Sequence, residues 1–582
     1  MKNYKKVYAA FILAGGLILH GCNGIFDDLA INPNQPSMGA YFTSPSAVND
    51  AVMTMYGYMS TQRCLGASGS KTTIIRSDEA SSNSDYGKPG MFGADLNASY
   101  YTIEQPYTLM YTTASQASYI IETAPSVDFS GNEELRNAYM GEAYFWRAFA
   151  HYYLLINFRN ISPIRQMPRN GDDYVRPLEK PAAVWNFIQE DLAHAKELLP
   201  VKGYWDSKNA GRVTKASAAA LLGKAYLYRS GIEQYYGEDK TTFYSEAAKE
   251  FGDVIDGKYG PYDLTKNYAD NFDVAHENNE ESILEFQFLG DVDNAGFNPG
   301  LATSGLAFDS RGLMLPGAGV GYEGVVHNWL YNAFVNSVDK DGYTDIRMFS
   351  TMIFNDLDAS IHLRNDAGGN PVRLEGPGGY KWEELYPAKN GKEGFATVSN
   401  PLAHSFKAGI RKGIDCSMPT QTEADGTPKL VGVGAGVKEY VYNQPRAHGV
   451  NWRYIRYADV LMMYAEAIVS GGTQASNMTP LQAVNKVRGR VNMSELPSVT
   501  MTDIQNERIL EFALEGHRFY DLLRWGKLAS RFTELQESDP NFKKFISADD
   551  FKGFVTNKHE WLPIPINEVN SNPYITENNP GY

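Results

Sequence analysis

The segment ERILEFALEGHRFYDLLRWG (507–526) mixes large apolar side chains with charged ones in a pattern typical of a buried helix. Arg508, Glu511, Glu515 and Arg518 are spaced three, four and three residues apart, which puts them on one helix face. Apolar residues lie between them, so part of this charged row must lie near the core, where buried charges have to be paired. The one histidine of the segment, beside two carboxylates, could also suggest metal or acid–base chemistry, but the H-E-x-x-H spacing is missing. We therefore interpret the charged row as structural.

Helical patterns of this kind fill most of the chain on both sides of its centre. We expect helices over 46–60, 106–124, 132–158, 181–200, 214–231, 241–256, 454–472, 479–491 and 501–526. Several of them form pairs whose second helix carries small residues, such as Gly141, Ala143, Ala148 and Ala150, which let two helices approach closely. The period is irregular. The sequence therefore predicts a mainly α fold, in which degenerate tetratricopeptide-like helical hairpins form one scaffold.

A segment from about 258 to 446 interrupts the helical patterns. It is rich in Gly, Asn and Asp and holds only short apolar runs, such as SILEFQF (282–288). We expect a loop-rich insertion with short helices and a few strands, embedded in a single domain that covers 45–582. The helical scaffold of that domain would comprise about 45–257 and 447–582. Loops carried on a rigid scaffold are where binding residues usually lie.

The composition excludes several classes of partner and site. The 582 residues carry a formal net charge of −15, which repels nucleic acid and anionic lipid headgroups. The three cysteines form no disulfide framework, although a single bond between Cys64 and Cys416 stays open. The ten histidines show no metal-ligand spacing, and the glycine-rich runs at 317–324 and 431–436 lack the context of a phosphate site. We expect no metal and no cofactor.

The N-terminus has the features of a secretory signal. Lysines precede an uncharged run at 7–19 that is too short to span a bilayer. The run ends in Leu-His-Gly-Cys, which resembles a bacterial lipobox with cleavage just before Cys22. We expect residues 1–21 to be a signal peptide, Cys22 to carry acyl chains, and residues 22–44 to be a tether. A plain secretory signal with an unmodified Cys22 is the alternative.

The 507–526 motif and the closing segment WLPIPINEVNSNPYITENNPGY (561–582) resemble the SusD/RagB family of nutrient-binding outer-membrane lipoproteins of Bacteroidetes. YFWRAFAHYYLLINF (144–158), ASAAALLGKAYLYR (216–229) and YIRYADVLMMYAEA (454–467) look like the family as well, in the right order. The resemblance implies a lipid-anchored protein exposed at the surface of the outer membrane. It also implies that the protein binds a glycan without catalysis and delivers it to a SusC-like, TonB-dependent transporter.

Two other functions stay open at this point. A few relatives of this family handle peptides, so a peptide or protein nutrient receptor of the same architecture is one alternative. A lipid-anchored glycoside hydrolase is the other, since loop-borne carboxylates could form an acid–base pair. However, 68 acidic residues make chance pairs unavoidable, and none of them has a motif.

The resemblance places the ligand contacts in two loop segments, RSDEASSNSDYGKPGMF (76–92) and GVGYEGVVHNWLYNAF (319–334), with a further pair of aromatics in YKWEELYP (380–387). The candidate contacts are Asp78, Asn83, Asp85, Tyr86, Tyr322, His327, Trp329, Tyr331, Trp382 and Tyr386. Each of them also has a structural interpretation. Asp78 could cap a helix or loop, and the spacing of Trp329 from Leu330 and Phe334 also fits a core side chain.

Overall fold

Helices dominate the part of the chain that the computed structural model describes, which comprises residues 42–82, 92, 96–169, 171–288, 308–309, 324–376, 379–398, 404–412, 430–432, 438–440, 447–539, 542 and 553–582. The α-helices are α4 (Pro45–Ser60), α5 (Ser70–Ile74), α6 (Tyr101–Thr123), α7 (Glu133–Phe158), α8 (Pro181–Leu198), α9 (Lys215–Tyr236), α10 (Tyr244–Ile255), α11 (Asn328–Val335), α12 (Arg347–Thr351), α13 (Trp382–Leu385), α14 (Tyr457–Val469), α15 (Pro480–Arg490), α16 (Met501–Glu511), α17 (Arg518–Arg524), α18 (Leu528–Ser538) and α19 (Ile566–Ser571). The predicted mainly α fold is confirmed.

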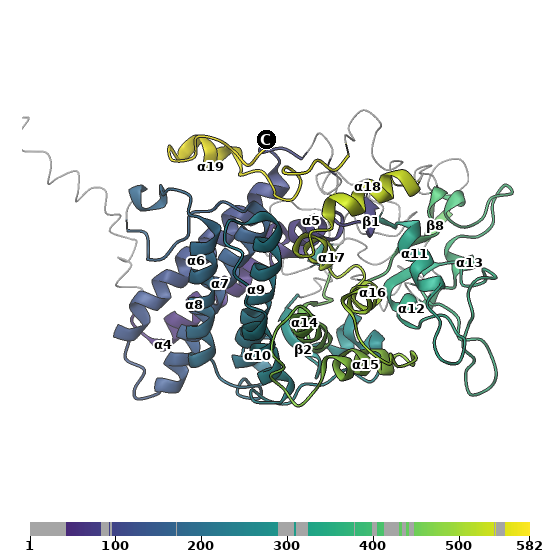
Figure 1. Cartoon of the computed structure of the whole chain (residues 1–582), viewed down its shortest axis with the longest axis horizontal. Helices are drawn as coiled ribbons and strands as arrows, with labels where there is room; N and C mark the ends of the chain where they lie inside the picture. The colour runs from purple at the N-terminus through teal and green to yellow at the C-terminus, as the bar shows by residue number, and fades with distance from the viewer. Residues whose placement is uncertain are drawn as a thin grey trace, which may run out of the picture.

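Helices that follow one another in the chain pack against one another. α6 packs on α7, α7 on α8, α8 on α9, and α9 on α10. α10 then packs directly on α14, although the whole insertion lies between them in the sequence, and α14 packs on α15. Figure 1 shows α6 to α10 side by side in the left half of the molecule. Helices on the two sides of the insertion therefore pack against each other.

Two helix ends differ from the sequence prediction by five residues each. α6 begins at Tyr101, so Pro106 lies inside the helix instead of at its start. α9 continues to Tyr236 instead of ending at Gly231. A Cβ atom at Gly231 would lie 2.5 Å from the carbonyl oxygen of Arg524. Gly231 therefore serves a close approach between α9 and α17 and does not end the helix.

The helix expected over 501–526 is not continuous, so this prediction is wrong. α16 ends at Glu511 and α17 begins at Arg518, with a turn between them. Leu514 and Gly516 adopt positive φ angles of 61° and 86° in this turn, a conformation that stops a right-handed helix. The turn separates Glu515 from the helix face of Glu511, so the charged row divides into two parts.

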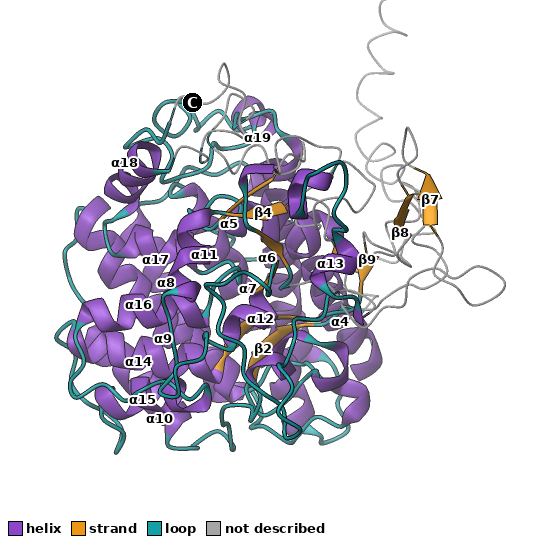
Figure 2. Cartoon of the chain, turned by 90° about the vertical axis from the view of Figure 1, so that its right-hand side faces the viewer, coloured by secondary structure: helices purple, strands orange, loops and turns teal. Residues whose placement is uncertain are grey.

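The strands are short and lie mainly in the insertion (Figure 2). They are β1 (Ala80–Ser82), β2 (Ser282–Phe286), β3 (Phe308–Asp309), β4 (Gly324–Val326), β5 (Met352–Phe354), β6 (Ala408–Ile410), β7 (Leu430–Gly432), β8 (Lys438–Tyr440), β9 (Ala447–His448) and β10 (Trp452–Arg456). One four-stranded sheet has the order β1-β4-β6-β5. β2 pairs antiparallel with β10, so the insertion is joined to the chain immediately before α14. The expected short helices and few strands are present.

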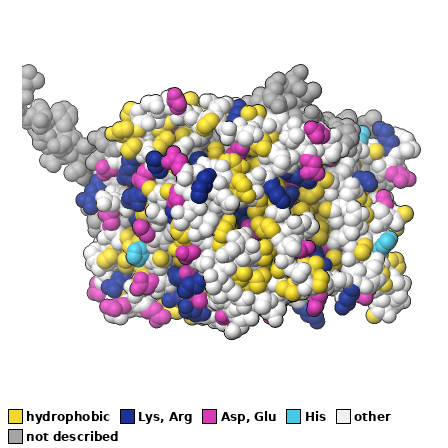
Figure 3. Space-filling view, viewed as in Figure 1, with side chains coloured by type: hydrophobic (Ala, Val, Ile, Leu, Met, Phe, Trp, Pro, Cys, Tyr) yellow, Lys and Arg dark blue, Asp and Glu magenta, His cyan; other side chains and the backbone are white. Residues whose placement is uncertain are grey.

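One hydrophobic core cluster extends from Phe42 to Ile575 and includes side chains of the scaffold helices and of the insertion. On the face shown in Figure 3, acidic and basic side chains are interspersed, and hydrophobic side chains gather in the middle. Within the described residues, no helix combines the length and the apolar character that crossing a membrane requires.

Candidate functional site

The charged row of the 507–526 motif belongs to a buried ion cluster. Glu511 accepts from Arg347 at 2.9 Å and from Arg456 at 2.7 Å, and it also pairs with Arg490. Burial alone would raise the pKa of Glu511, but the three arginines outweigh it and hold the pKa well below the usual range. The connected set balances five cations with five carboxylates: Arg347, Lys412, Arg456, Arg488 and Arg490 with Glu281, Asp345, Glu507, Glu511 and Glu515.

The remaining charges of the motif are paired as well. Arg508 donates to Asp459 and to Asp521, both at 2.8 Å, and Arg518 donates to Asp78 at 2.9 Å. His517 is buried, and burial together with the nearby Lys224 ammonium lowers its pKa to about 4. The expectation that the buried charges of the motif are paired is confirmed. Their carboxylates hold the fold together and leave no acid–base pair in this segment.

The two predicted ligand segments meet in the structure. β1 pairs antiparallel with β4, and Ala80 faces Val326 while Ser82 faces Gly324. The backbone N–H of His327 also donates to the carbonyl of Glu79 at 2.9 Å. Segments that are far apart in the sequence are therefore held side by side by backbone hydrogen bonds. Such backbone pairing sets the relative position of the side chains that follow it.

Trp329 is held rigidly beside this strand pair. Its indole Nε1 donates to the backbone carbonyl of Asp78 at 2.5 Å. The Arg531 guanidinium lies 4.3 Å from the ring centroid, and that of Arg518 lies 5.4 Å from it. Both arginines also donate to the Asp78 carboxylate, at 2.6 and 2.9 Å. The half-buried ring thus has a fixed orientation, which a flat ligand face requires.

Four other candidate side chains are buried. His327 lies 2.8 Å from the Ser81 hydroxyl through its Nε2, and burial lowers its pKa to about 4. Tyr331 is in the hydrophobic core. The rings of Trp382 and Tyr386 lie 4.7 Å apart at an angle of 50°, and both pack on Phe395.

Asp78 is fully buried and engaged by two arginines. These five residues therefore have structural roles in the described chain, and a direct ligand contact at any of them stays a prediction.

Several predicted positions lie outside the described residues. Asn83, Asp85 and Tyr86 follow β1 in the sequence, and Tyr322 precedes β4. Their contact with a ligand stays a prediction. Cys22 and Cys416 also lie outside the described residues. Cys64 is a buried free thiol.

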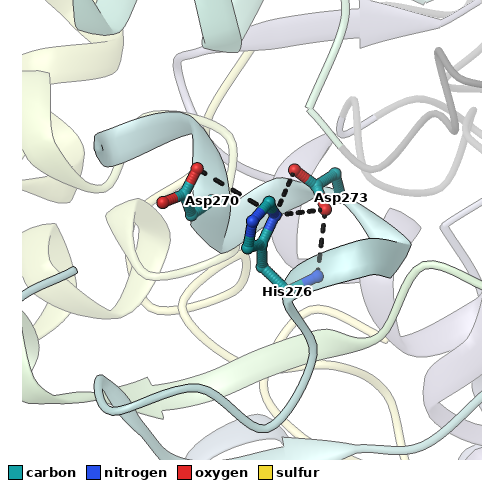
Figure 4. Close-up of side chains that lie close together, drawn as sticks. All are labelled: Asp270, Asp273 and His276. Atoms are coloured by element: carbon teal, nitrogen blue, oxygen red, sulfur yellow. Dashed lines mark hydrogen bonds and ion pairs between the residues drawn. The ribbon is translucent and has the colours of Figure 1, made fainter. Parts of the chain in front are cut away.

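Among the described residues, one group could present ligands to a metal ion: the ligand atoms of Asp270, Asp273 and His276 lie within 4.8 Å of one another. Asp270 and His276 lie on successive 3₁₀ turns, Tyr268–Phe272 and Val274–His276, and Asp273 lies between the two turns. Nδ1 of His276 lies 2.9 Å from both carboxylate oxygens of Asp273 and 4.0 Å from Asp270 (Figure 4). The hydrogen bond and the charge of Asp273 raise the pKa of His276. These contacts are those of a histidine–carboxylate pair that caps a turn, and they carry no metal assignment.

Comparison with known proteins gives the family. A family model described as "SusD family" matches residues 425–582, and one described as "Starch-binding associating with outer membrane" matches residues 31–227. The chain belongs to the SusD family. The matched ranges include the 507–526 motif, the closing segment and the first scaffold helices, which carried the resemblance in the sequence.

Similar proteins match this SusD family member over nearly the whole chain. A SusD-like protein of Bacteroides ovatus is 25% identical over 90% of this chain and 83% of its own length. The SusD-like protein P2 of Formosa agariphila is 24% identical over the full length of both chains.

Solved structures show the same fold. A SusD superfamily protein from Bacteroides vulgatus covers 93% of this chain and 100% of its own, with a TM-score of 0.66 at 22% identity. A laminarin-binding SusD-like protein covers the same shares, with a TM-score of 0.64 at 23% identity. The surface glycan-binding protein A of Bacteroides thetaiotaomicron in complex with laminarihexaose covers 92% of this chain and 100% of its own, with a TM-score of 0.65 at 19% identity.

Among the described residues, Arg531 belongs to this candidate site and was not predicted from the sequence. It lies on α18, beyond the motif, and it stacks over Trp329 while it donates to Asp78. An arginine seven residues before the end of a polar helix carries no local signal that it contacts a segment 200 positions away. Its partners, Asp78 and Trp329, are brought together by the pairing of β1 with β4.

Proposed function

We propose that this protein binds an oligosaccharide or polysaccharide at the cell surface without cleaving it, and delivers it to a SusC-like, TonB-dependent transporter in the outer membrane. The names of similar proteins support the glycan: a laminarin-binding protein, a glycan-binding protein in complex with laminarihexaose, and a family described as starch-binding and associated with the outer membrane. An acyl anchor at Cys22 and a single folded unit over 45–582 belong to the same proposal.

The observation that carries the proposal is the Trp329 ring beside the β1–β4 pair, whose orientation is fixed by contacts with Asp78, Arg518 and Arg531. A sugar ring needs a fixed aromatic face next to polar groups. The half-buried indole of Trp329 supplies that face, since its Nε1 is bonded to the Asp78 carbonyl and the Arg531 guanidinium lies 4.3 Å from the ring centroid. A hydrolase would need two carboxylates that reach its substrate. Two described carboxylates at this place, those of Asp78 and Glu79, are buried and bonded within the protein.

The test is binding by the full chain, solubilised in a detergent that carries no sugar. A glycan array that includes laminarihexaose identifies the strongest ligand, and calorimetry then measures its affinity. We expect Trp329→Ala to weaken binding about 5- to 150-fold, which corresponds to ~1–3 kcal/mol of lost stacking. Trp329→Phe, which keeps a flat face, should recover part of the affinity. Circular dichroism checks that both variants are folded.

Glu511→Gln provides the contrast, because it acts on the fold and not on the ligand. It leaves arginines of the buried cluster without a counter-charge, which costs about 3–5 kcal/mol of stability. We expect a lower melting temperature and an unchanged affinity in the folded fraction. Glu190→Gln is the matched control: Glu190 is exposed on α8, and no ion pair between described residues includes it.

The outcomes separate the alternatives. Normal binding by Trp329→Ala, combined with loss of binding in a fully folded Glu511→Gln variant, would show that the site is placed wrongly. Chromatography of the bound sugar after long incubation reads out catalysis, and shortened products would mean a hydrolase. Binding of peptides with no response to any glycan would favour the peptide receptor.

A further inference from the structure

A second pocket lies between α6 and the C-terminal helix α19, beside the chain around Ser162 and Arg176. Its cavity volume is about 370 Å³, which is near the lower end for small-molecule sites. In Figure 1, α6 and α19 lie to the left, whereas α11, which carries Trp329, lies to the right. The pocket is therefore separate from the site beside β1 and β4.

Two tyrosines of α6 form the aromatic part of the pocket. The rings of Tyr107 and Tyr111 lie 4.9 Å apart with an angle of 57° between them, and Tyr111 is half-buried. The Tyr111 hydroxyl accepts the Ser162 N–H at 3.1 Å and is also bonded to the Tyr107 hydroxyl. Burial raises the pKa of Tyr111, so the hydroxyl keeps its proton. The pocket thus has an aromatic face and a hydroxyl group fixed by the backbone.

The polar groups of the pocket are also held in place by the protein. Glu104 accepts from the side-chain amide of Asn567 at 2.5 Å, a contact that joins α6 to α19. Glu568 accepts from the side-chain amide of Asn572 at 3.0 Å. Arg176 donates to the carbonyl of Pro163 at 3.3 Å. Because each group is oriented through one atom before a ligand arrives, little ordering would be needed on binding.

We propose that this pocket is a second sugar site, which binds a neutral saccharide. Among its lining residues the carboxylates of Glu104, Asp173 and Glu568 outnumber the Arg176 guanidinium, which disfavours an anionic ligand. A sugar hydroxyl both donates and accepts, and the lining offers carboxylates as acceptors with Arg176 as a donor. A simple cation would need acceptors alone. The Tyr111 ring adds the flat face that one side of a sugar ring matches.

Hydrogen–deuterium exchange of the full chain, in a detergent without sugar, tests the proposal. The probes are laminarihexaose, maltohexaose, cellohexaose, spermidine and inorganic phosphate. We expect at least one of the three sugars to slow amide exchange in α6 and α19. Thr108→Trp should abolish the slowing, because Thr108 is exposed, lines the pocket, and would fill it with an indole. Thr54→Trp, at an exposed position of α4 outside the lining, should leave it intact.

Each result decides the question. No slowing in α6 and α19 with any of the three sugars overturns the second site, as does slowing by spermidine or phosphate in place of sugar. Slowing that persists in Thr108→Trp also overturns it. Trp329→Ala separates this inference from the proposed function: slowing in α6 should survive in that variant. Sugar effects confined to α11 would leave the proposed function standing while the second site fails.

Discussion

Asp78 and Glu79 are neighbours in the chain and are both buried, yet their surroundings act on them in opposite directions. Burial would raise the pKa of Asp78, but Arg518 and Arg531 outweigh it and lower the pKa. Glu79 has no such pair. Burial, together with the charge of Asp78, raises the pKa of Glu79 to about 8. Next to Trp329, the Asp78 carboxylate is therefore ionised, whereas the Glu79 carboxyl favours its protonated form.

Glu79→Gln should make folding less sensitive to pH. The folded pKa of about 8 lies above the ordinary glutamate pKa of 4.5, so the stability that Glu79 contributes is present below about pH 4.5 and is lost as pH rises through 8. Glutamine can still accept the Leu514 N–H, which Glu79 accepts at 3.0 Å. Chemical denaturation at about pH 5 and about pH 9 should show the variant gaining on the parent, on the order of a few kcal/mol, at the higher pH. An equal difference at both pH values would contradict the raised pKa.

At the residue scale, the sequence predicts that charges are paired but not with whom. The spacing of Glu511 and Glu515 within an apolar segment required counter-charges. The partners Arg347 and Lys412 come from the insertion, and nothing in their local sequence marks them. The same limit applies to the ligand site. Trp329 was predicted, whereas Arg531, which fixes its ring, was not.

At the scale of the element, local signals predict where helices begin better than where they stop. Asn132 caps α7, and Thr500 with Asp503 forms the capping box of α16. Both are readable in sequence. The turn at Gly516 interrupts a continuous helical pattern, and Gly516 lies so close to α5 that a Cβ atom there would be 2.7 Å from the Thr73 hydroxyl. This close approach depends on the packing of the turn against α5. The sequence of the 507–526 segment alone does not show that packing.

Gly231→Ala should destabilise the protein although alanine favours helices. The new Cβ would lie 2.5 Å from the Arg524 carbonyl oxygen, so α9 and α17 would have to move apart. We expect a loss of about 1–3 kcal/mol in the free energy of unfolding. Gly57→Ala in α4 is the matched control, because nothing lies within 4 Å of its Cβ position, and it should gain about 0.5–1 kcal/mol. Equal effects of the two substitutions in urea unfolding would show that no close packing exists at Gly231.

At the scale of the whole molecule, the insertion contributes to the scaffold that carries it. Asp345, Arg347 and Lys412 supply one carboxylate and two cations to the ion cluster around α16. β2 pairs with β10 next to α14, and α10 packs on α14. Without the insertion, Glu507, Glu511 and Glu515 would each lose a cation. The sequence shows an insertion between helical patterns. It does not show which charged residues of the insertion pair with α16, because these residues lie far apart in the chain.

Cys22→Ala tests how the whole molecule is held at the membrane. The lipobox-like end of the apolar run predicts acyl chains on Cys22 as the membrane anchor. Each buried CH₂ of such chains contributes about 0.8 kcal/mol, and more than one chain makes the anchoring durable. We expect the parent in the detergent phase of a temperature-induced phase separation and the variant in the aqueous phase. Cys64→Ala, at a buried free thiol, should behave as the parent. A Cys22→Ala protein that stays in the detergent phase as the parent does would contradict the acyl anchor.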